Sequence, residues 1–468
     1  MRVAWLDPLV DYPIYGDLTG SPLFNNSYDI SLPLAYVYLS SFVRASRPHF
    51  EFVYHPRRLY SALGTLPPIE ALISDADVVL TSCSTADSPD ARRILRAAKH
   101  AGKPTVIGGI YARFSPSEIL SWGCADFVVT GEGEAALLAI LDHIASGATS
   151  APRIAGVVCP SLNEVTPPRQ VPLESLPQPV YDYLPLDDFR RFMRTAYILA
   201  TRGCPAPCHF CTSARLYGYS YRTRPVHSVV KELADLHSRG FDSITLADDT
   251  ITVDRAWALD LLRRIADANP GYRLKVRARA DELDSEVITA MSAAGVEVVQ
   301  FGVESINLST REFMHKRLSQ QAIEQAFDLV SKVDGMKANP LYMLAYPGET
   351  WDDLERNADF IASVGTDPRV ITYVSFTTPY PGTAFRRYAE SGRGFILTDD
   401  PRYYTNKFPV FLPASLLTIP AREGMARLLA IYDRIAAAVN RSHATQFPVP
   451  DEFFADLRWP SDQILAPS

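Results

Sequence analysis

Three cysteines lie close together in the stretch RGCPAPCHFC, which spans residues 202–211. Three residues separate Cys204 from Cys208, and two separate Cys208 from Cys211. In a reducing compartment, closely spaced cysteines usually bind metal or carry out redox chemistry. Thiolates hold zinc ions and iron–sulfur clusters, and a cubane cluster normally takes four of them. Three thiolates on a cubane would leave one iron open to bind and reduce a substrate.

A zinc site is the alternative interpretation of this stretch. Structural zinc takes four ligands, usually as two separated pairs. No cysteine follows Cys211, and His209 stands between two cysteines, where it is poorly placed to complete a tetrahedron with them. The remaining cysteines, Cys83, Cys124 and Cys159, lie in apolar surroundings and are expected to pack in the core. The spacing therefore favours one iron–sulfur cluster over zinc.

The composition is that of an ordinary globular protein of two to three domains. The 468 residues are 47% hydrophobic and carry a formal net charge of −7, which gives no electrostatic reason to expect nucleic acid or a membrane as a partner. The start MRVAWLDPLV lacks the basic and apolar regions of a signal peptide, and no apolar run reaches the roughly 18 residues that a membrane-spanning helix needs. We therefore expect a cytoplasmic protein with reduced cysteines.

Strands and helices alternate after the cysteine stretch. The apolar run at 195–201 predicts a strand that leads into the cysteine loop, and six strand–helix units follow one another to about residue 385. Such repetition implies a parallel sheet covered by helices. Six units fit a partial (β/α)6 barrel better than a closed eight-unit barrel, and in parallel barrels the chemistry lies at the carboxyl ends of the strands.

The cysteine spacing resembles that of the radical S-adenosylmethionine (radical SAM) superfamily, whose motif is Cys-x3-Cys-x2-Cys. Phe210 before the last cysteine, which we assign to the cofactor-binding residues, and the strand that leads into the loop also match. The resemblance implies that the three cysteines hold one 4Fe-4S cluster and that SAM chelates its open iron. One-electron reduction, by an external donor such as flavodoxin or ferredoxin, would then release a 5′-deoxyadenosyl radical from SAM.

The resemblance places SAM contacts at the strand ends. Asp248 and Asp249 in LADDT stand where the family has a GGE-like segment for the SAM amino group. Glu304 in FGVES stands where the family often contacts ribose, and Gly348 in YPGET stands near the adenine region. Each has a plainer interpretation. The aspartates could cap a turn or helix, Glu304 could be an ordinary strand-end acid, and Gly348 could form a turn with the preceding proline.

Three further residues are predicted to be catalytic. Arg277 and Arg279 in KVRARAD alternate onto one face of a predicted strand and would point into the barrel toward a carboxylate, although most arginines are solvated. Tyr217 lies close to the cysteine loop and would face the substrate, although most tyrosines near loops only pack.

Residues 1–150 predict a separate, doubly wound α/β domain of the Rossmann type. Ligands of such sheets lie outside the carboxyl ends of the strands, here at 81–85, 108–114 and 130–134. Small residues in these turns would let a large flat ligand approach the backbone. The predicted cofactor contacts are Ser82, Gly108, Gly109 and Gly131. The region has no Gly-x-Gly-x-x-Gly fingerprint and no phosphate loop.

This domain resembles the cobalamin-binding domain fused ahead of many radical SAM domains. The shared features are an early PLAYxxL-like helix, a GG turn after the fourth strand and the segment DFVVTGEGE. The resemblance implies bound cobalamin, although no Asp-x-His-x-x-Gly stretch supplies a histidine ligand for cobalt. Tyr111 stands where relatives often have histidine, and it is expected to intrude on the corrin space. Loss of cobalamin from a retained scaffold is the alternative.

The predicted organisation is a cobalamin-binding-like domain at 1–150, a Pro-rich linker at 151–190, a radical SAM core at 191–388 and a small helical tail at 389–468. The tail has one strong helix pattern, at 422–440. It contains no cysteine for a second cluster, which argues against a net two-electron dehydrogenation.

We therefore predict a radical SAM enzyme that acts on a small-molecule precursor, expected in secondary-metabolite or antibiotic biosynthesis. Cobalamin-dependent C-methylation is the leading reaction. The alternative is a redox-neutral dehydration, epimerisation or rearrangement of a sugar or aminoglycoside-type substrate without cobalamin. A non-catalytic cobalamin or iron–sulfur sensor is the third hypothesis, and a sensor would not need the SAM-site residues.

Overall fold

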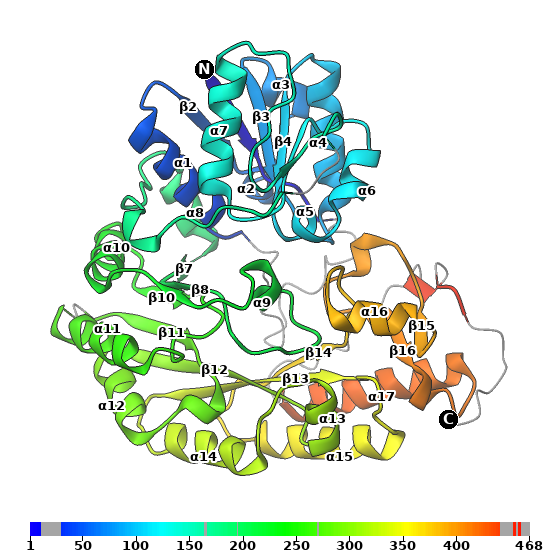
Figure 1. Cartoon of the computed structure of the whole chain (residues 1–468). Coiled ribbons are helices and arrows are strands. Elements are labelled where there is room, and N and C mark those ends of the chain that lie inside the picture. Colours follow the sequence, from blue (N-terminus) through cyan, green and yellow to red (C-terminus); the bar gives the residue numbers. More distant parts are fainter. Residues whose placement is uncertain are drawn as a thin grey trace. The chain divides into compact units, whose positions relative to one another are not determined.

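The chain forms two compact units (Figure 1). The structure is a computed structural model, and it describes residues 1–10, 30–162, 166–193, 195–268, 271–439, 453–454 and 457–459. Unit 1 comprises residues 1–11, 28–198 and 222–242, and unit 2 comprises residues 12–27, 199–221 and 243–468. Both units are built from strands and helices, which confirms the predicted α/β class.

Unit 1 contains a six-stranded sheet with the order β2-β1-β3-β4-β5-β6. Its strands are β1 (Arg2–Leu6), β2 (Glu51–His55), β3 (Val78–Ser82), β4 (Thr105–Gly108), β5 (Phe127–Val129) and β6 (Val157–Val158). All neighbours are parallel except β5 and β6, which are antiparallel. The strand order reverses at β1, so a switch point lies between β1 and β3, where open α/β sheets bind their ligands. The predicted doubly wound domain is confirmed.

Helices cover both faces of this sheet (Figure 1). On one face, α1 (Leu34–Ser46) packs against α7 (Gly133–Ala145). The other face carries α3 (Ile69–Ile73), α4 (Ser88–His100), α5 (Ile110–Phe114) and α6 (Pro116–Ser121). The apolar side chains of α4 recur at helical spacing and are buried in two clusters against the strands, while its charged side chains are mostly directed outward.

The second sheet has the order β14-β13-β12-β11-β10-β7. Its strands are β7 (Thr195–Ile198), β10 (Ser243–Leu246), β11 (Arg273–Arg277), β12 (Val296–Glu304), β13 (Lys337–Leu344) and β14 (Tyr373–Phe376). The pairs from β10 to β14 are parallel. Helices connect successive strands, namely α11 (Arg255–Ala268), α12 (Ser285–Ala293), α14 (Gln320–Ser331) and α15 (Trp351–Val364). This arrangement confirms the predicted partial barrel.

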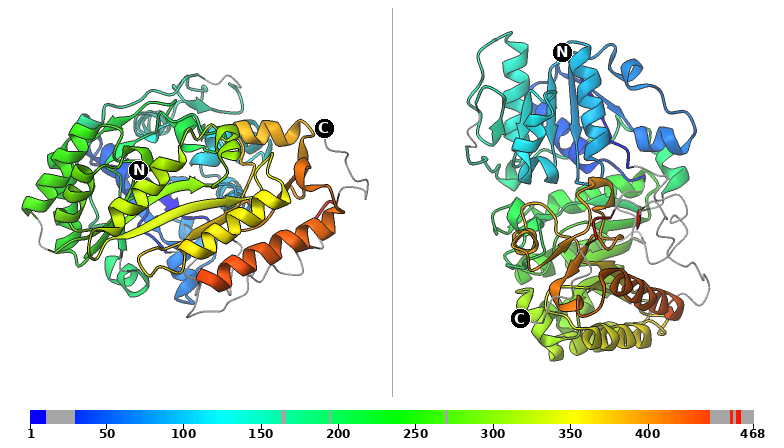
Figure 2. Two further views of the ribbon diagram at one scale, coloured as in Figure 1. Left: turned by 90° about the horizontal axis from the view of Figure 1, so that it is seen from below. Right: turned by 90° about the vertical axis from the view of Figure 1, so that its right-hand side faces the viewer.

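The C-terminal tail contains more than the predicted helix. Helix α17 (Ala421–Val439) lies along α15 (Figure 2), and Arg434 pairs with Glu355 across the two helices at 2.6 Å. Residue 440, the predicted last residue of this helix, lies outside the described residues. Strands β15 (Gly394–Ile396) and β16 (Phe411–Pro413) form an antiparallel pair that the sequence analysis did not predict.

Within the predicted linker, β6 joins the first sheet and α8 (Leu186–Phe192) begins near the end of the segment. The domain boundaries at 150, 190 and 388 stay predictions. No helix in the described part of the chain combines the length and the apolar character needed to cross a membrane.

Candidate functional site

The three cysteines lie on the loop that follows strand β8 (Thr201–Arg202). All are free and partly exposed. Gly203 starts the loop in the left-handed region with φ +92°, and a Cβ there would overlap the Ser220 carbonyl, so only glycine fits. Burial raises the pKa of all three thiols, that of Cys208 to about 11. The thiols must therefore lose protons when a metal binds.

The three thiols lie on one loop. The charge of Cys211 acts on both Cys204 and Cys208, so the three cysteines lie near one another. One zinc ion needs ligands that converge on a point, whereas each thiolate of a cubane binds a different iron. The preference for a cluster over zinc rests on the spacing of the cysteines in the sequence.

Backbone hydrogen bonds hold the middle of the loop. The His209 N–H donates to the Met314 carbonyl at 2.9 Å, and the Phe385 N–H donates to the His209 carbonyl at 3.0 Å. Phe210, predicted as a cofactor contact, packs against an apolar cluster that includes Tyr346, with ring centroids 6.3 Å apart. In this structure the aromatic residue before the last cysteine anchors the loop.

The two aspartates after β10 have different environments. Asp248 is fully buried, and its carboxylate accepts hydrogen bonds from the backbone N–H and, at 2.7 Å, the hydroxyl of Thr201. Burial raises the pKa of Asp248 to about 6. Asp249 is partly exposed, and its charge raises the pKa of Cys204 and Cys211. Asp248 therefore fixes the strand before the cysteine loop, while Asp249 lies beside the loop.

Glu304 forms a buried ion pair at the end of β12. The Lys316 ammonium lies 2.9 Å from its carboxylate, and the two side chains are 11% and 8% exposed. Glu304 has φ +67° beside a register shift, so the strand end is irregular there. A Cβ on Gly302 would overlap both charged groups, so the pair folds back over this glycine. Lys316 also lowers the pKa of Cys208, which places the pair near the cysteine loop.

The two predicted catalytic arginines make different contacts. Arg277 donates to the Gln300 side-chain carbonyl at 2.7 Å. Burial raises the pKa of Asp249, and the nearby Arg277 charge offsets only part of this rise. Arg279 forms two hydrogen bonds with the Asp281 carboxylate, at 2.8 and 3.0 Å. The Arg277 charge therefore acts on Asp249 beside the loop. Arg279, although its guanidinium is hydrogen-bonded to Asp281, also lies near the loop, because its charge opposes the rise that burial causes in the pKa of Cys204 and Cys208.

Gly348 and Tyr217 lie at two other loops. Gly348 has φ +89°, and a Cβ there would meet open space. The neighbouring Glu349 is fully buried and accepts hydrogen bonds from the Ser305 hydroxyl at 3.1 Å and the Tyr346 N–H at 2.9 Å. It therefore ties together the loops after β12 and β13. Tyr217 packs close to Gly203 at the start of the cysteine loop.

In unit 1, the strand ends of β3 and β4 lie side by side, with Ser82 opposite Gly108. A Cβ on Gly108 would find Val129 as its nearest neighbour, at 3.9 Å, so the space above it is open. Gly109 has φ +96°, and a Cβ there would lie 2.5 Å from the Cys83 carbonyl. The space above Gly131 is instead filled by Pro168. The open surface is therefore at Ser82 and Gly108.

The aromatic residues Trp5, Tyr36 and Tyr111 pack inside unit 1. Tyr111 is 5% exposed, donates its hydroxyl to the Glu118 carboxylate at 2.5 Å and stacks with Trp122. Trp5 and Tyr36 are buried against each other, with ring centroids 5.9 Å apart. The Tyr111 ring thus belongs to the core on the α4–α6 side of the sheet.

Charged side chains that follow β1, β2 and β3 pair with one another at the same edge. Arg57 pairs with buried Asp90, and Arg58 pairs with Asp87 at 2.8 Å. The Tyr54 hydroxyl donates to the Asp7 carboxylate. Burial raises the pKa of Asp87 to about 6. These groups are paired with one another, whereas the last residues of β3 and β4 are the uncharged Ser82 and Gly108.

The sequence models of two families match the chain. The Radical SAM superfamily matches residues 198–361, which include the cysteine loop and its neighbouring strand ends. The B12 binding domain matches residues 27–141, which include the β3 and β4 strand ends. The chain therefore contains a radical SAM domain and a B12-binding domain, which confirms the predicted resemblance.

Several relatives of this radical SAM chain are named as methyltransferases. An uncharacterized methyltransferase of Pyrococcus horikoshii is 29% identical over 81% of this chain and 82% of its own length. Cytidylyl-2-hydroxyethylphosphonate methyltransferase of Streptomyces wedmorensis is 23% identical over 56% of this chain, and the match spans only 57% of that relative. The solved structure of the radical SAM methyltransferase TsrM from Kitasatospora setae has a TM-score of 0.69 at 19% identity and covers 92% of this chain and 90% of TsrM. TsrM therefore shares the fold.

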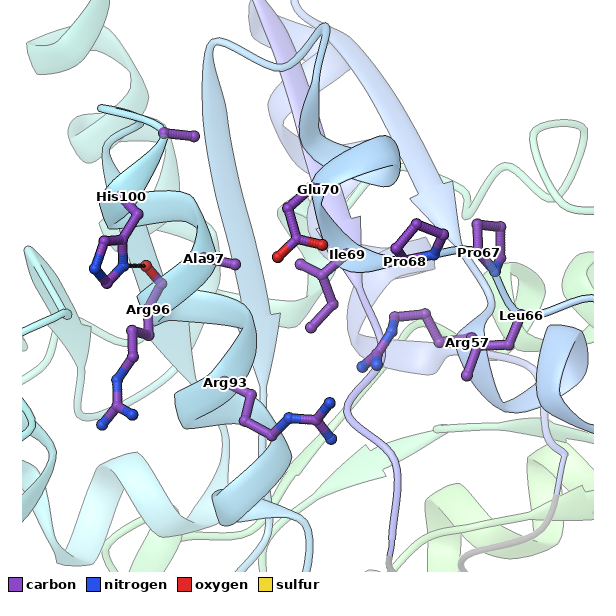
Figure 3. A pocket seen from close by; sticks show the side chains of 11 residues that line it. Arg57, Leu66, Pro67, Pro68, Ile69, Glu70, Arg93, Arg96, Ala97 and His100 are labelled. Atoms are coloured by element: carbon purple, nitrogen blue, oxygen red, sulfur yellow. Dashed lines mark hydrogen bonds between the residues drawn. The ribbon is translucent and has the colours of Figure 1, made fainter.

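A pocket in the B12-binding unit shares Arg57 with the strand-end charges described above but none of the predicted cofactor contacts. It has a volume of about 890 Å³ and lies between the start of α3 and one face of α4 (Figure 3). Arg57, Arg93 and Arg96 line it together with Glu70 and a Pro67–Pro68 wall. None of the predicted cofactor-binding residues lines this pocket.

Sequence reasoning missed Lys316, Glu349 and Thr201 in the radical SAM domain. Lys316 was hidden because a lysine after a short helix is usually a solvated charge. Glu349 directly follows the predicted Gly348, and its position in YPGET was the available signal. The partner of Asp248 lies 47 residues away in the chain, so only the fold brings Thr201 beside it.

Proposed function

We propose that this chain is a cobalamin-dependent radical SAM methyltransferase that methylates a carbon atom of a small molecule. The observation that carries the proposal is the presence, in one chain, of a B12-binding domain and a radical SAM domain with a complete three-cysteine loop. Relatives named as methyltransferases support it, including hopanoid C-3 methylase of Methylococcus capsulatus, which is 27% identical over 60% of this chain.

Cys204, Cys208 and Cys211 would hold the cluster, because they are free, partly exposed and gathered on one loop. When bound, the cluster and SAM supply the 5′-deoxyadenosyl radical, and cobalamin supplies the methyl group. The Asp249 carboxylate would accept a hydrogen bond from the SAM amino group, because it lies beside two of the cysteines. Glu304 would contact the SAM ribose with Lys316 holding its carboxylate in place.

In the B12-binding domain, Ser82 and Gly108 would line the corrin. They are neighbours across β3 and β4, and Gly108 borders open space. Gly109 would support them by keeping the turn tight against Cys83. The TsrM structure, which shares this fold, holds both cobalamin and a [4Fe-4S] cluster, so the fold accommodates the two groups.

The substrate is proposed to be a small molecule that presents a carboxylate or another anionic group. Arg277 lies beside the cysteine loop, and its guanidinium would bind such a group. Tyr217, which packs close to Gly203 at the start of the cysteine loop, would contact the substrate. TsrM has been solved with tryptophan as its substrate, and tryptophan is a small molecule that carries a carboxylate.

Anaerobic purification with added cobalamin tests the proposal. We expect about four irons per chain, one cobalamin per chain, and a visible spectrum that contains both chromophores. With SAM and a reductant, the loaded chain should form 5′-deoxyadenosine. A protein that binds the cluster and forms 5′-deoxyadenosine but takes up no cobalamin would exclude methyl transfer, and it would favour the radical dehydration or epimerisation named above.

A further inference from the structure

We propose that the outer rim of the cysteine loop is the docking surface for an acidic one-electron carrier protein. The rim patch consists of Arg215, Phe313, His315, Arg387, Tyr388 and Arg393. The inference rests on the radical SAM part of the proposed function, because a cluster on the cysteine loop must receive an electron from outside the chain.

His209 connects the rim patch to the cluster ligands. It directly follows Cys208, and its ring lies 3.8 Å from the ring of exposed His315. The turn that carries His315 is tied to the loop by the hydrogen bond from the His209 N–H to the Met314 carbonyl. Because electron transfer slows steeply with distance, a carrier bound on this patch would stand close to the cysteine ligands.

The patch is positively charged. The Arg215 guanidinium donates to the Gly382 carbonyl, just before α16 (Ala384–Glu390). Arg387 lies on α16 two residues after Phe385, whose N–H donates to the His209 carbonyl. Arg393 lies over the Tyr388 ring, 5.5 Å from its centroid. Across the part of the chain that the structure describes, none of these three arginines forms an ion pair with a carboxylate.

The charges around the rim patch show that the excess of positive charge is confined to the patch. Arg386, on the same helix α16 (Ala384–Glu390), is paired with Glu390 at 2.7 Å and contributes little free charge. Glu312 is the exposed acid next to Phe313. The whole chain carries a net charge of −7, so a positive patch at the cluster loop is opposite in sign to the protein's overall charge.

An exposed aromatic residue lies among these cations. Phe313 at the end of α13 (Leu308–Phe313) is 41% exposed. Its ring centroid lies 5.4 Å from that of Tyr388, and 6.1 Å from that of buried Tyr346, with edge-to-face geometry in both cases. Aromatic and arginine side chains together are typical of protein interfaces, where the aromatic ring packs and the arginines select the partner.

Charge complementarity identifies the partner as an acidic carrier, such as a flavodoxin. In the docked complex the reduced carrier loses one electron and the oxidised cluster gains it, and no bond forms or breaks. Opposite charges on the two surfaces would accelerate the encounter, and salt would weaken this effect.

The test uses the reconstituted full chain with the double variant Arg387→Glu/Arg393→Glu. We expect the second-order rate constant for cluster reduction by reduced flavodoxin, measured by stopped-flow absorbance, to fall about 10- to 100-fold at low salt. Its dependence on ionic strength should flatten. Flavodoxin binding, measured by calorimetry, should weaken as well. Dithionite should reduce the variant at the wild-type rate, because a small reductant does not need the patch.

The double variant Arg263→Glu/Arg264→Glu is the matched control. It changes the charge by the same amount on α11, which connects β10 to β11, and β10 is separated from β14 by three strands (Figure 1). Both arginines there are exposed, and each pairs with Asp260 on the same helix. Equal loss in the control, or a twofold or smaller loss in the patch variant, would overturn the proposal.

A milder pair, Arg387→Gln/Arg393→Gln, should give an intermediate loss. A wild-type chain whose iron cannot be reduced even by dithionite would contradict the proposed function rather than the docking surface. Calorimetry would then still show whether flavodoxin binds the wild-type chain more tightly than the patch variant, because this binding needs no electron transfer.

Discussion

The strand-end edges of the two sheets differ in what their charged side chains do. In the B12-binding unit, the charges that follow β2 are paired with carboxylates that follow β3, as in Arg57–Asp90 and Arg58–Asp87. The adjacent β3 and β4 ends present Ser82 and Gly108. In the radical SAM domain, by contrast, Asp249 and the Glu304–Lys316 pair lie beside the cysteine loop.

This difference reflects the two kinds of ligand. A broad, flat corrin needs small residues and exposed backbone, and charged side chains would obstruct it. A cluster with SAM needs thiolates and fixed charges, which only side chains provide. The four predictions that follow test this contrast, from the largest expected effect to the smallest.

Replacing one cluster ligand should produce the largest loss. In Cys208→Ala the loop keeps only two thiolates, and the iron content after anaerobic reconstitution should fall to background, together with formation of 5′-deoxyadenosine. Cys83→Ala is the control, because Cys83 is buried in the core of the B12-binding unit and its loss should cost only about 1 kcal/mol of packing. An iron content in Cys208→Ala equal to that of the wild type would show that Cys208 is not a ligand of the cluster.

Lys316→Met should destabilise the radical SAM domain by about 3–5 kcal/mol, because it leaves the Glu304 carboxylate buried and unpaired. SAM affinity should fall as well. The double variant Glu304→Gln/Lys316→Met should recover most of the stability but not the SAM affinity. Thermal unfolding and equilibrium SAM binding measure the two effects separately. If the single and double variants unfold alike, the pair has no energetic importance.

Two strand-end glycines allow the contrast to be tested with the same substitution. Gly302→Ala should displace the Glu304–Lys316 pair and lower SAM affinity, because its Cβ would overlap both charged groups. Gly108→Ala should leave stability within about 0.5 kcal/mol, since its nearest neighbour is 3.9 Å away. It should nevertheless reduce cobalamin uptake, measured by the visible spectrum. Normal uptake by Gly108→Ala would place the corrin elsewhere.

Glu349→Gln should remove a small pH dependence of stability. Burial raises the pKa of Glu349 to about 7, above its unfolded value. The contribution of the protonated Glu349 to stability is therefore fully present below the unfolded pKa. It is lost as the pH rises through about 7, because the buried carboxyl group then ionises in the folded state. Between pH 8 and pH 6 the wild type should gain about 1 kcal/mol that Glu349→Gln does not gain. Identical shifts of the melting temperature in both proteins would show that Glu349 does not titrate in this range.

Much of the fold was predictable, because strand and helix periodicities are local. Alternation after residue 195 predicted the six-stranded parallel sheet, and the pattern before residue 150 predicted the doubly wound sheet. The antiparallel strands β6, β15 and β16 were missed, because each has only two or three residues and carries no periodic signal.

The sequence by itself determined the cysteine loop, since the spacing of Cys204, Cys208 and Cys211 is written in ten consecutive residues. It also placed Asp249 and Gly108 at strand ends, because strand ends follow from local patterns. Only the tertiary structure decided which of these residues face a ligand and which serve the fold. The pairing of Glu304 with Lys316 and of Asp248 with Thr201 joins segments that are 12 and 47 residues apart. The burial of a side chain and its bonding partner are properties of the packed chain. They make Asp248 a structural anchor and leave Asp249, which has the same chemistry, as a candidate cofactor ligand.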